Sequence, residues 1–287
     1  MEAGFLTDYL LPFTLAFIMW GMGLSLVTDD FKRVVVYPKA VFMGLLNQLL
    51  LLPLITFSVV VWFGISTELA VGMMILAACP GGATSNLISH LAKGDTALSI
   101  TLTAFSSLFT VVTVPVIVNF ALIHFMPNGQ KMQLDVSSTI ISVILVVILP
   151  VAIGMWVRHW KPKFSDKMGA PIKYISAIFL LIIIAGAAIA ERERVVEYMQ
   201  LIGPACVVLN VLTLSIGYFS GKLAKLTTRQ SFTVAIETGI QNGTLGIGVA
   251  SSLIGNATMT IPAAIYSLIM FITAFVVIYI GNKTVKD

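Results

Sequence analysis

The sequence predicts an all-α polytopic membrane protein with nine transmembrane helices. Of its 287 residues, 58% are apolar and 10% are charged, whereas roughly 25% are charged in a typical soluble domain. The apolar residues gather in runs of about 20, the length at which a helix crosses a bilayer. Only short connections separate these runs, so we expect residues 1–287 to form a single membrane domain.

The nine apolar runs follow one another along the chain. In order, they cover about residues 9–27, 40–63, 69–91, 97–123, 139–157, 172–190, 201–221, 232–253 and 261–280. The first run lacks the basic region and the small-residue cleavage pattern of a signal peptide, so we expect it to be retained as a span. Asp95, directly after Gly94, has the residue type and position of the N-terminal cap of the fourth run.

Basic residues gather in alternate connections. If the N-terminus is external, all 17 Lys and Arg residues except Lys131, Arg192 and Arg194 lie on the cytoplasmic side. The positive-inside rule therefore predicts a multi-pass protein of the cell membrane with its N-terminus outside and its C-terminus in the cytoplasm. The same rule accounts for the net charge of +4, so we expect no nucleic-acid partner.

Two runs are interrupted near their centres. The third run contains CPGGATSN at residues 79–86, and the eighth contains ETGIQNG at residues 237–243. In the first motif the proline removes a backbone hydrogen-bond donor and the two glycines make the backbone more flexible. The two runs cross in opposite directions, and mid-membrane amides precede each: Asn47 and Gln48 in the first half, Asn210 in the second. This pattern predicts inverted repeats of four plus five helices, with two discontinuous helices that cross.

Glu237 is the only one of the 13 Asp and Glu residues that the runs do not place near a water interface. A carboxylate buried in the membrane needs a cation, a proton or a hydrogen-bond donor. Ser99 and Thr103 lie one turn apart on the hydroxyl-bearing face of the fourth run, and Ser85 and Asn86 follow the first break. These oxygens suit sodium better than a transition metal. Alternatively, such hydroxyls bond to their own helix.

A second group of oxygens would share the same carboxylate. It consists of the Gln48 and Gln241 side chains and the carbonyls of Thr238 and Ile240. An interhelical hydrogen bond is the alternative role for Gln48. The N-terminal ends of the half-helices that follow about Gly82 and Gly243 would direct positive dipoles at an anion.

Other reactive side chains show no site-forming pattern. Cys79 and Cys206 fall inside apolar runs and are expected to be buried free thiols. The three histidines lie near run ends without paired ligand spacing. No nucleophile with a base partner, phosphate loop or nucleotide motif occurs, so the sequence predicts no enzyme.

The segments CPGGATSN, LAKGDTALSITLTAFSSL and ETGIQNG resemble the bile acid:sodium symporter family, and the resemblance covers essentially the whole chain. It implies a panel domain (about residues 5–30 and 136–192) beside a core domain (about residues 38–124 and 198–282) that holds the two broken helices. It also implies two sodium sites and a substrate cavity. The first sodium site maps onto Ser85, Asn86, Ser99, Thr103 and Glu237, and the second onto Gln48, Glu237, Gln241, Thr238 and Ile240. Around the substrate we expect Ala83, Thr84, Asn242, Gly243 and Met270.

The leading hypothesis is a monomeric symporter in the lipid bilayer that couples sodium to an organic anion by alternating access. Because Ile269, Met270 and Phe271 depart from the Trp-His-Asn reading of bacterial relatives, the resemblance implies a class of anion, either bile acid-like or a small carboxylate such as pantoate or a keto acid. The alternative is a proton-coupled carrier or exporter in which Glu237 titrates. A scaffold has no need of broken helices, and a channel would line a continuous pore with polar residues.

Overall fold

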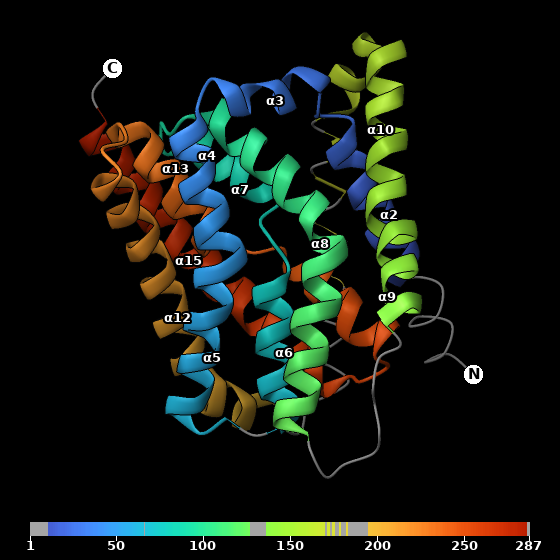
Figure 1. Ribbon diagram of the computed structural model, residues 1–287, viewed down its shortest axis with the longest axis vertical. Coiled ribbons are helices and arrows are strands. Elements are labelled where there is room, and N and C mark those ends of the chain that lie inside the picture. Colours follow the sequence, from blue (N-terminus) through green and yellow to red (C-terminus); the bar gives the residue numbers. More distant parts are fainter. Residues whose placement is uncertain are drawn as a thin grey trace.

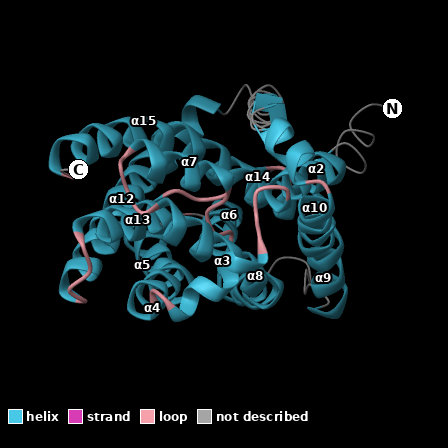
Figure 2. Ribbon diagram, turned by 90° about the horizontal axis from the view of Figure 1, so that it is seen from above, coloured by secondary structure: helices cyan, strands magenta, loops and turns pink. Residues whose placement is uncertain are grey.

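The computed structural model describes residues 11–65, 67–126, 136–169, 171, 172, 174, 175, 178, 182 and 195–285. Within these residues all regular structure is helical, as Figures 1 and 2 show. The principal helices are α2 (Leu11–Gly23), α3 (Thr28–Lys32), α4 (Pro38–Leu46), α5 (Leu52–Phe63), α6 (Thr67–Ala78), α7 (Ala83–Leu91), α8 (Thr96–Phe125), α9 (Val136–Val143), α10 (Leu149–Trp160), α12 (Val195–Leu223), α13 (Thr228–Gly239), α14 (Gly243–Gly248) and α15 (Ile261–Thr284).

Helices long and apolar enough to cross a membrane occur at five places. They are Pro38–Phe63, Thr96–Phe125, Ile140–Trp160, Val196–Leu223 and Thr258–Thr284, and the number rises to seven if each of two bent helix pairs is one span. The predicted all-helical membrane architecture is thus confirmed at this level. The sixth predicted run, residues 172–190, lies largely outside the described residues.

The first span ends earlier than the sequence predicted. Helix α2 stops at Gly23, and α3 turns away from it by 75° instead of continuing to residue 27. Two acidic residues begin α3, and the carboxylate of Asp30 accepts hydrogen bonds from the Val27 amide at 2.8 Å and from Arg33 at 2.7 Å. A charged first turn favours the interface over the hydrocarbon, so the chain bends there.

Two spans contain a π-helical turn that ends two residues before a proline. One turn, Asn47–Leu51, joins α4 to α5 and is followed by Pro53; the other, Ile144–Ile148, joins α9 to α10 and is followed by Pro150. Proline has no amide hydrogen for the i−4 carbonyl, and the widened turn accommodates the loss. The first of these turns carries Asn47 and Gln48, and both are buried.

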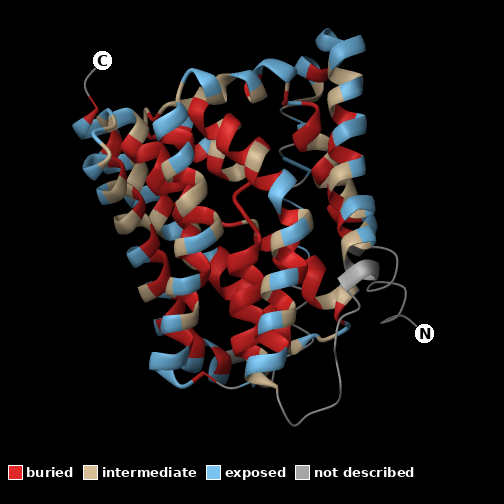
Figure 3. Ribbon diagram, viewed as in Figure 1, coloured by how far each residue is buried: buried red, intermediate tan, exposed pale blue. Residues whose placement is uncertain are grey.

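The two broken helices are the most enclosed elements. Every residue from Leu69 to Ala78 in α6 is buried, as is every residue from Ser231 to Gly239 in α13 and every residue of α14. Elsewhere large apolar side chains are exposed on the outer faces, for example Trp62 at 79% and Phe275 at 75%. Figure 3 shows buried residues at the centre and exposed residues on the outside. Many large exposed side chains are apolar, as expected for a protein surrounded by lipid.

Helices α2, α9 and α10 stand together on one side of the molecule in both views (Figures 1 and 2). Glycines allow α2 and α10 to pack closely: a Cβ atom on Gly23 would lie 2.2 Å from the Val151 carbonyl oxygen, and one on Gly154 would lie 2.4 Å from that of Trp20. Leu15 of α2 in turn packs against Gly248 after the second break. This group therefore contacts the broken helices directly.

The described basic residues collect at one end of the molecule, where Figure 1 places α3 and the C-terminal ends of α10 and α15. They occur in α3, in the connections after α3, α7, α10 and α12, and at the ends of the helices at this end of the molecule. The described Lys and Arg residues are Lys32, Arg33, Lys39, Lys93, Arg158, Lys161, Lys163, Lys167, Lys222, Lys225, Arg229 and Lys283. Among the described residues, the other end has no Lys or Arg. The asymmetry expected from the sequence is thus a property of the folded chain.

Candidate functional site

Glu237 lies two residues before the end of α13 and is 4% exposed. Its two carboxylate oxygens face α8, where Ser99 Oγ donates to Oε1 at 2.5 Å and Thr103 Oγ1 donates to Oε2 at 3.1 Å. The two hydroxyls lie one turn apart on α8 and therefore on the same face. Within the described residues Glu237 makes no ion pair with Lys or Arg, so its charge lacks a protein counter-charge there.

Asn86 completes this cluster from the first turn of α7. Its Oδ1 atom lies 2.8 Å from Ser99 Oγ and 3.1 Å from Thr103 Oγ1. Each hydroxyl carries one hydrogen but has two oxygen acceptors within bonding distance. The oxygens therefore outnumber the hydrogens available to them, and a cation or a proton would satisfy the cluster.

Ser85 is buried beside Asn86 in the same turn. Its hydroxyl donates to the Gly82 carbonyl at 2.8 Å, which leaves the lone pairs of Oγ available to a cation. The structure thus brings together Ser85, Asn86, Ser99, Thr103 and Glu237 from three different helices. Their role as sodium ligands stays a prediction.

The second predicted cluster forms at the break in α13. Gln48 Nε2 donates to Gln241 Oε1 at 3.0 Å, and Gln241 Nε2 donates to the Thr238 carbonyl at 2.7 Å. The Gln48 Oε1 atom is buried without a hydrogen-bond partner. An unpaired buried oxygen is unfavourable unless something binds it. The hydrogen bonds of Glu237 itself lead to the first cluster, so the two clusters adjoin along α13.

The two helix breaks lie against each other. The backbone N–H of Asn242 donates a hydrogen bond to the Cys79 carbonyl at 3.5 Å, and a Cβ atom on Gly81 would lie 3.0 Å from the Ile240 carbonyl oxygen. A Cβ atom on Gly82 would lie 3.3 Å from Asn242 Nδ2. Because glycine has no side chain, the two unwound segments can approach each other at these positions. Lipid offers no hydrogen-bond partners, so unwound backbone at membrane depth needs partners within the protein.

The sequence profile described as "Sodium Bile acid symporter family" matches residues 12–198. The chain belongs to this family. As a member of the sodium bile acid symporter family it is a multi-pass, sodium-coupled transporter and not an enzyme. Within the described residues no group of three His, Cys, Asp or Glu side chains forms a transition-metal site.

Relatives extend the match along most of the chain. The chain is 31% identical over 254 residues to the uncharacterized sodium-dependent transporter YocS of Bacillus subtilis, covering 88% of this chain and 77% of that protein. It is 30% identical over 253 residues to the probable sodium/metabolite cotransporter BASS2 of rice chloroplasts, covering 88% and 58%. It is also 30% identical over 284 residues to the human ileal sodium/bile acid cotransporter, covering 94% and 77%.

In this symporter family member, the residues expected near the substrate lie in different environments. Ala83, Thr84 and Asn242 are half-buried at the paired breaks. Gly243 is buried, and a Cβ atom there would lie 1.9 Å from Ser267 Oγ, so α14 packs directly on α15. Met270 is 1% exposed and belongs to the apolar core.

The two half-helices after the breaks begin differently. Asn242 Oδ1 accepts a hydrogen bond from the Leu245 amide at 3.0 Å and so caps α14. The corresponding position before α7 is Gly82, which provides no side-chain cap. The first amides of α7 therefore lack a side-chain acceptor, whereas those of α14 have one.

The sequence reasoning missed Tyr266. Its hydroxyl donates to the Gly239 carbonyl at 2.9 Å, and Asn210 Nδ2 donates to the same oxygen at 2.8 Å. Tyr266 occurs early in the last predicted run, where tyrosine is ordinarily interfacial, yet it is fully buried. The two side chains fix the last carbonyl of α13, next to the unwound segment that carries Ile240.

Proposed function

We propose that this chain is a secondary active symporter that moves sodium ions and an organic monoanion across a membrane in the same direction. The observation that carries the proposal is Glu237, a buried carboxylate without a described counter-charge, enclosed by hydroxyl and amide oxygens where α7, α8 and α13 meet. Hard monovalent cations prefer such an all-oxygen environment. The relatives' printed names, which include sodium/metabolite and sodium/bile acid cotransporters, support the coupling ion.

Two sodium sites follow from the two oxygen clusters. The first would use Ser85, Asn86, Ser99, Thr103 and Glu237. The second would use Gln48, Gln241 and the carbonyls of Thr238 and Ile240, and would share the negative charge of Glu237. The unpartnered Gln48 Oε1 atom supports the second site.

The anion would bind at the paired breaks. The uncapped N-terminus of α7, with half-buried Ala83 and Thr84, offers backbone donors and a positive dipole end to a carboxylate. Asn242 lies beside Gly82 and would contribute its amide. The relatives' printed names, sodium/bile acid and sodium/metabolite cotransporters, support two kinds of substrate. Among metabolites, the family resemblance of the sequence implies a small carboxylate such as pantoate or a keto acid.

Sodium binding would make this site receptive. One sodium ion would neutralise Glu237, and the second would leave a net positive charge that favours a monoanion. The two ions would also join α7, α8 and the α13 break into one unit, so the anion would bind well only to the sodium-loaded state. Alternating access would follow from rigid-body movement of the broken-helix core against a panel. The close α2–α10 pair, together with α9 and the sixth predicted run, is our candidate for that panel.

The complete architecture would have nine spans, arranged as inverted repeats of four plus five. The cluster of basic residues at one end supports a cytoplasmic C-terminus and an external N-terminus in the cell membrane. We expect the monomer to be the transporting unit, since both clusters lie within one chain.

Uptake into proteoliposomes tests the proposal. An inward sodium gradient should drive accumulation of an organic monoanion, and Glu237→Ala should abolish the sodium-driven component. Glu197→Gln removes an exposed carboxylate at the start of α12 and serves as the control. If replacement of sodium by potassium at fixed pH left wild-type uptake unchanged, the proton-coupled alternative would replace this proposal.

A further inference from the structure

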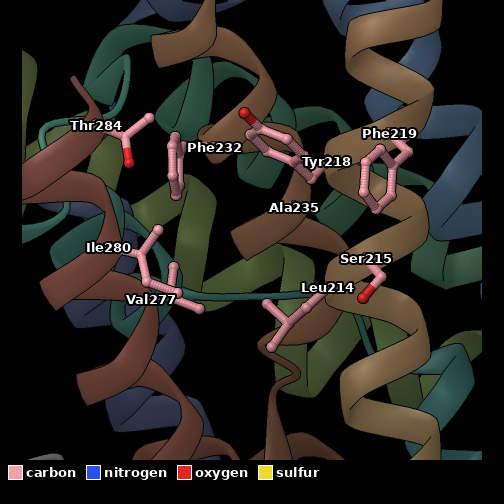
Figure 4. Close-up of a pocket in the computed structure, with 9 residues that line it drawn as sticks. All are labelled: Leu214, Ser215, Tyr218, Phe219, Phe232, Ala235, Val277, Ile280 and Thr284. Atoms are coloured by element: carbon pink, nitrogen blue, oxygen red, sulfur yellow. The ribbon is translucent and has the colours of Figure 1, made fainter.

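A groove separates α12, α13 and α15 near the basic end of the molecule. It has a volume of about 280 Å³, and its walls are mostly apolar. Figure 4 shows the aromatic side chains at one end of the groove and aliphatic side chains further along it. The residues that matter here are Leu214, Tyr218, Phe219, Phe232, Val277 and Ile280.

The groove opens onto the lipid-facing surface. Phe219 and Ile280 line it and are 63% and 45% exposed, and the neighbouring Leu223 and Tyr279 are 84% and 60% exposed. Side chains this apolar are expected to meet hydrocarbon. An occupant of the groove is therefore reached from the bilayer, which favours an acyl chain over a water-soluble solute.

Each of the three helices that form the groove carries one basic residue close in sequence to a residue that lines the groove. Lys222 follows the lining residue Phe219 by three positions, Arg229 precedes Phe232 by three, and Lys283 directly precedes Thr284, which also lines the groove. None of the three makes an ion pair with a described residue. The only acidic residue between positions 198 and 285 is Glu237, which faces α8.

Lys222 contacts the aromatic end of the groove, whereas Lys283 Nζ lies 4.5 Å from the ring centroid of Tyr279, beside the groove on α15. The Tyr218 and Phe232 rings lie edge to face with centroids 5.2 Å apart, and Lys222 Nζ lies 5.6 Å from the Tyr218 ring centroid. Basic clusters between membrane helices bind anionic lipid headgroups. We propose that the groove binds an anionic glycerophospholipid, with one acyl chain along the apolar walls and the phosphate among Lys222, Arg229 and Lys283.

The test uses the purified, delipidated full chain in a non-ionic detergent. Dioleoyl phosphatidylglycerol is titrated in, and bound lipid is counted by native mass spectrometry while the midpoint of thermal unfolding is recorded. A lipid that binds the folded state raises this midpoint. Dioleoyl phosphatidylcholine carries the same chains without net charge, and glycerol 1-phosphate carries the charge without chains. We expect phosphatidylglycerol alone to bind and to raise the midpoint.

Charge variants identify the headgroup site. The triple variant Lys222→Gln, Arg229→Gln, Lys283→Gln should weaken phosphatidylglycerol binding by at least about tenfold, since each basic residue adds to the attraction for an anionic lipid. The matched control removes three exposed lysines that follow α10, Lys161, Lys163 and Lys167, and should leave binding unchanged. An undiminished affinity in the first variant, or an equal loss in both variants, overturns the proposal.

A second variant tests the chain site without altering charge. Ser215 lines the groove, so Ser215→Phe should fill it and displace the lipid. Val211→Phe adds a comparable side chain one turn earlier on α12, at a position that is 49% exposed and outside the lining, and should bind lipid as the wild type does. Binding by Ser215→Phe at wild-type affinity, or equal effects of phosphatidylglycerol and either control compound, likewise contradicts a lipid site.

Discussion

Ser99 and Glu237 are separated by 138 residues in sequence, and their side chains meet at 2.5 Å in the buried centre of the molecule. Thr103 reaches the second carboxylate oxygen from the next turn of the same helix. This contact joins α8 of the first half of the chain to the broken helix of the second half. A cation or proton bound at Glu237 would therefore act on side chains from both halves.

Removing the two hydroxyls should weaken sodium binding. Ser99→Ala or Thr103→Val deletes a hydrogen bond to a charged group, an interaction of about 1.5–3 kcal/mol, so the sodium concentration for half-maximal uptake should rise at least about tenfold. Ser107→Ala on the same helix removes a buried hydroxyl that donates to the Thr103 carbonyl, and it should leave this concentration nearly unchanged. Sodium titrations of uptake by the three variants make the comparison, and equal effects would refute a specific role.

Loss of the second cluster should alter the number of coupled ions. Gln241→Leu removes both the acceptor of Gln48 and the donor to the Thr238 carbonyl, and the Hill coefficient for sodium should fall from near two to about one. Thr56→Val on α5 is the control, because this hydroxyl donates only to the Leu52 carbonyl. A Hill coefficient that stays at the wild-type value in Gln241→Leu would contradict the second site.

Tyr266→Phe should act on sodium binding through the backbone. The change preserves the ring and removes the hydroxyl that donates to the Gly239 carbonyl, and the lost hydrogen bond should destabilise the fold by about 1 kcal/mol. Because Gly239 precedes Ile240, the apparent sodium affinity should also fall, while uptake at saturating sodium stays near wild type. Tyr279→Phe changes a tyrosine that is 60% exposed and should alter neither property. Thermal unfolding and sodium titration together distinguish a positioning role from a purely structural one.

Glycine at the α2–α10 contact should be required for stability. Gly23→Ala would place its Cβ atom 2.2 Å from the Val151 carbonyl oxygen, a separation that forces the helices apart, so the unfolding midpoint should drop. Gly203→Ala on α12 meets no atom within 4 Å and should raise stability by up to about 1 kcal/mol, because alanine favours the helix over glycine. A midpoint for Gly23→Ala equal to that of the wild type would show that the contact is looser than the structure indicates.

Much of the helical architecture could be predicted because the bilayer fixes its length scale. Apolar runs of about 20 residues correspond to spans, and Pro80, Gly81 and Gly82 indicated the break before α7. The Asp95 cap is confirmed, since its carboxylate accepts a hydrogen bond from the Leu98 amide at 3.0 Å. The end of α2 was predicted too far along the chain, because hydropathy alone did not reveal that Asp30 would cap a new helix.

Local sequence determined which segments are helical, where two of them break, and that one carboxylate lies far from water, because these properties depend on chain length, backbone donors and the hydropathy of neighbours. Only the tertiary structure decided which faces meet. In a membrane helix most faces are apolar, so periodicity does not distinguish a core position such as Met270 from a lipid-facing one. Contacts between distant segments of the chain produce three features: the proximity of Glu237 to Ser99, the burial of Tyr266 and the alignment of the two breaks. These contacts form only when the whole helix bundle assembles.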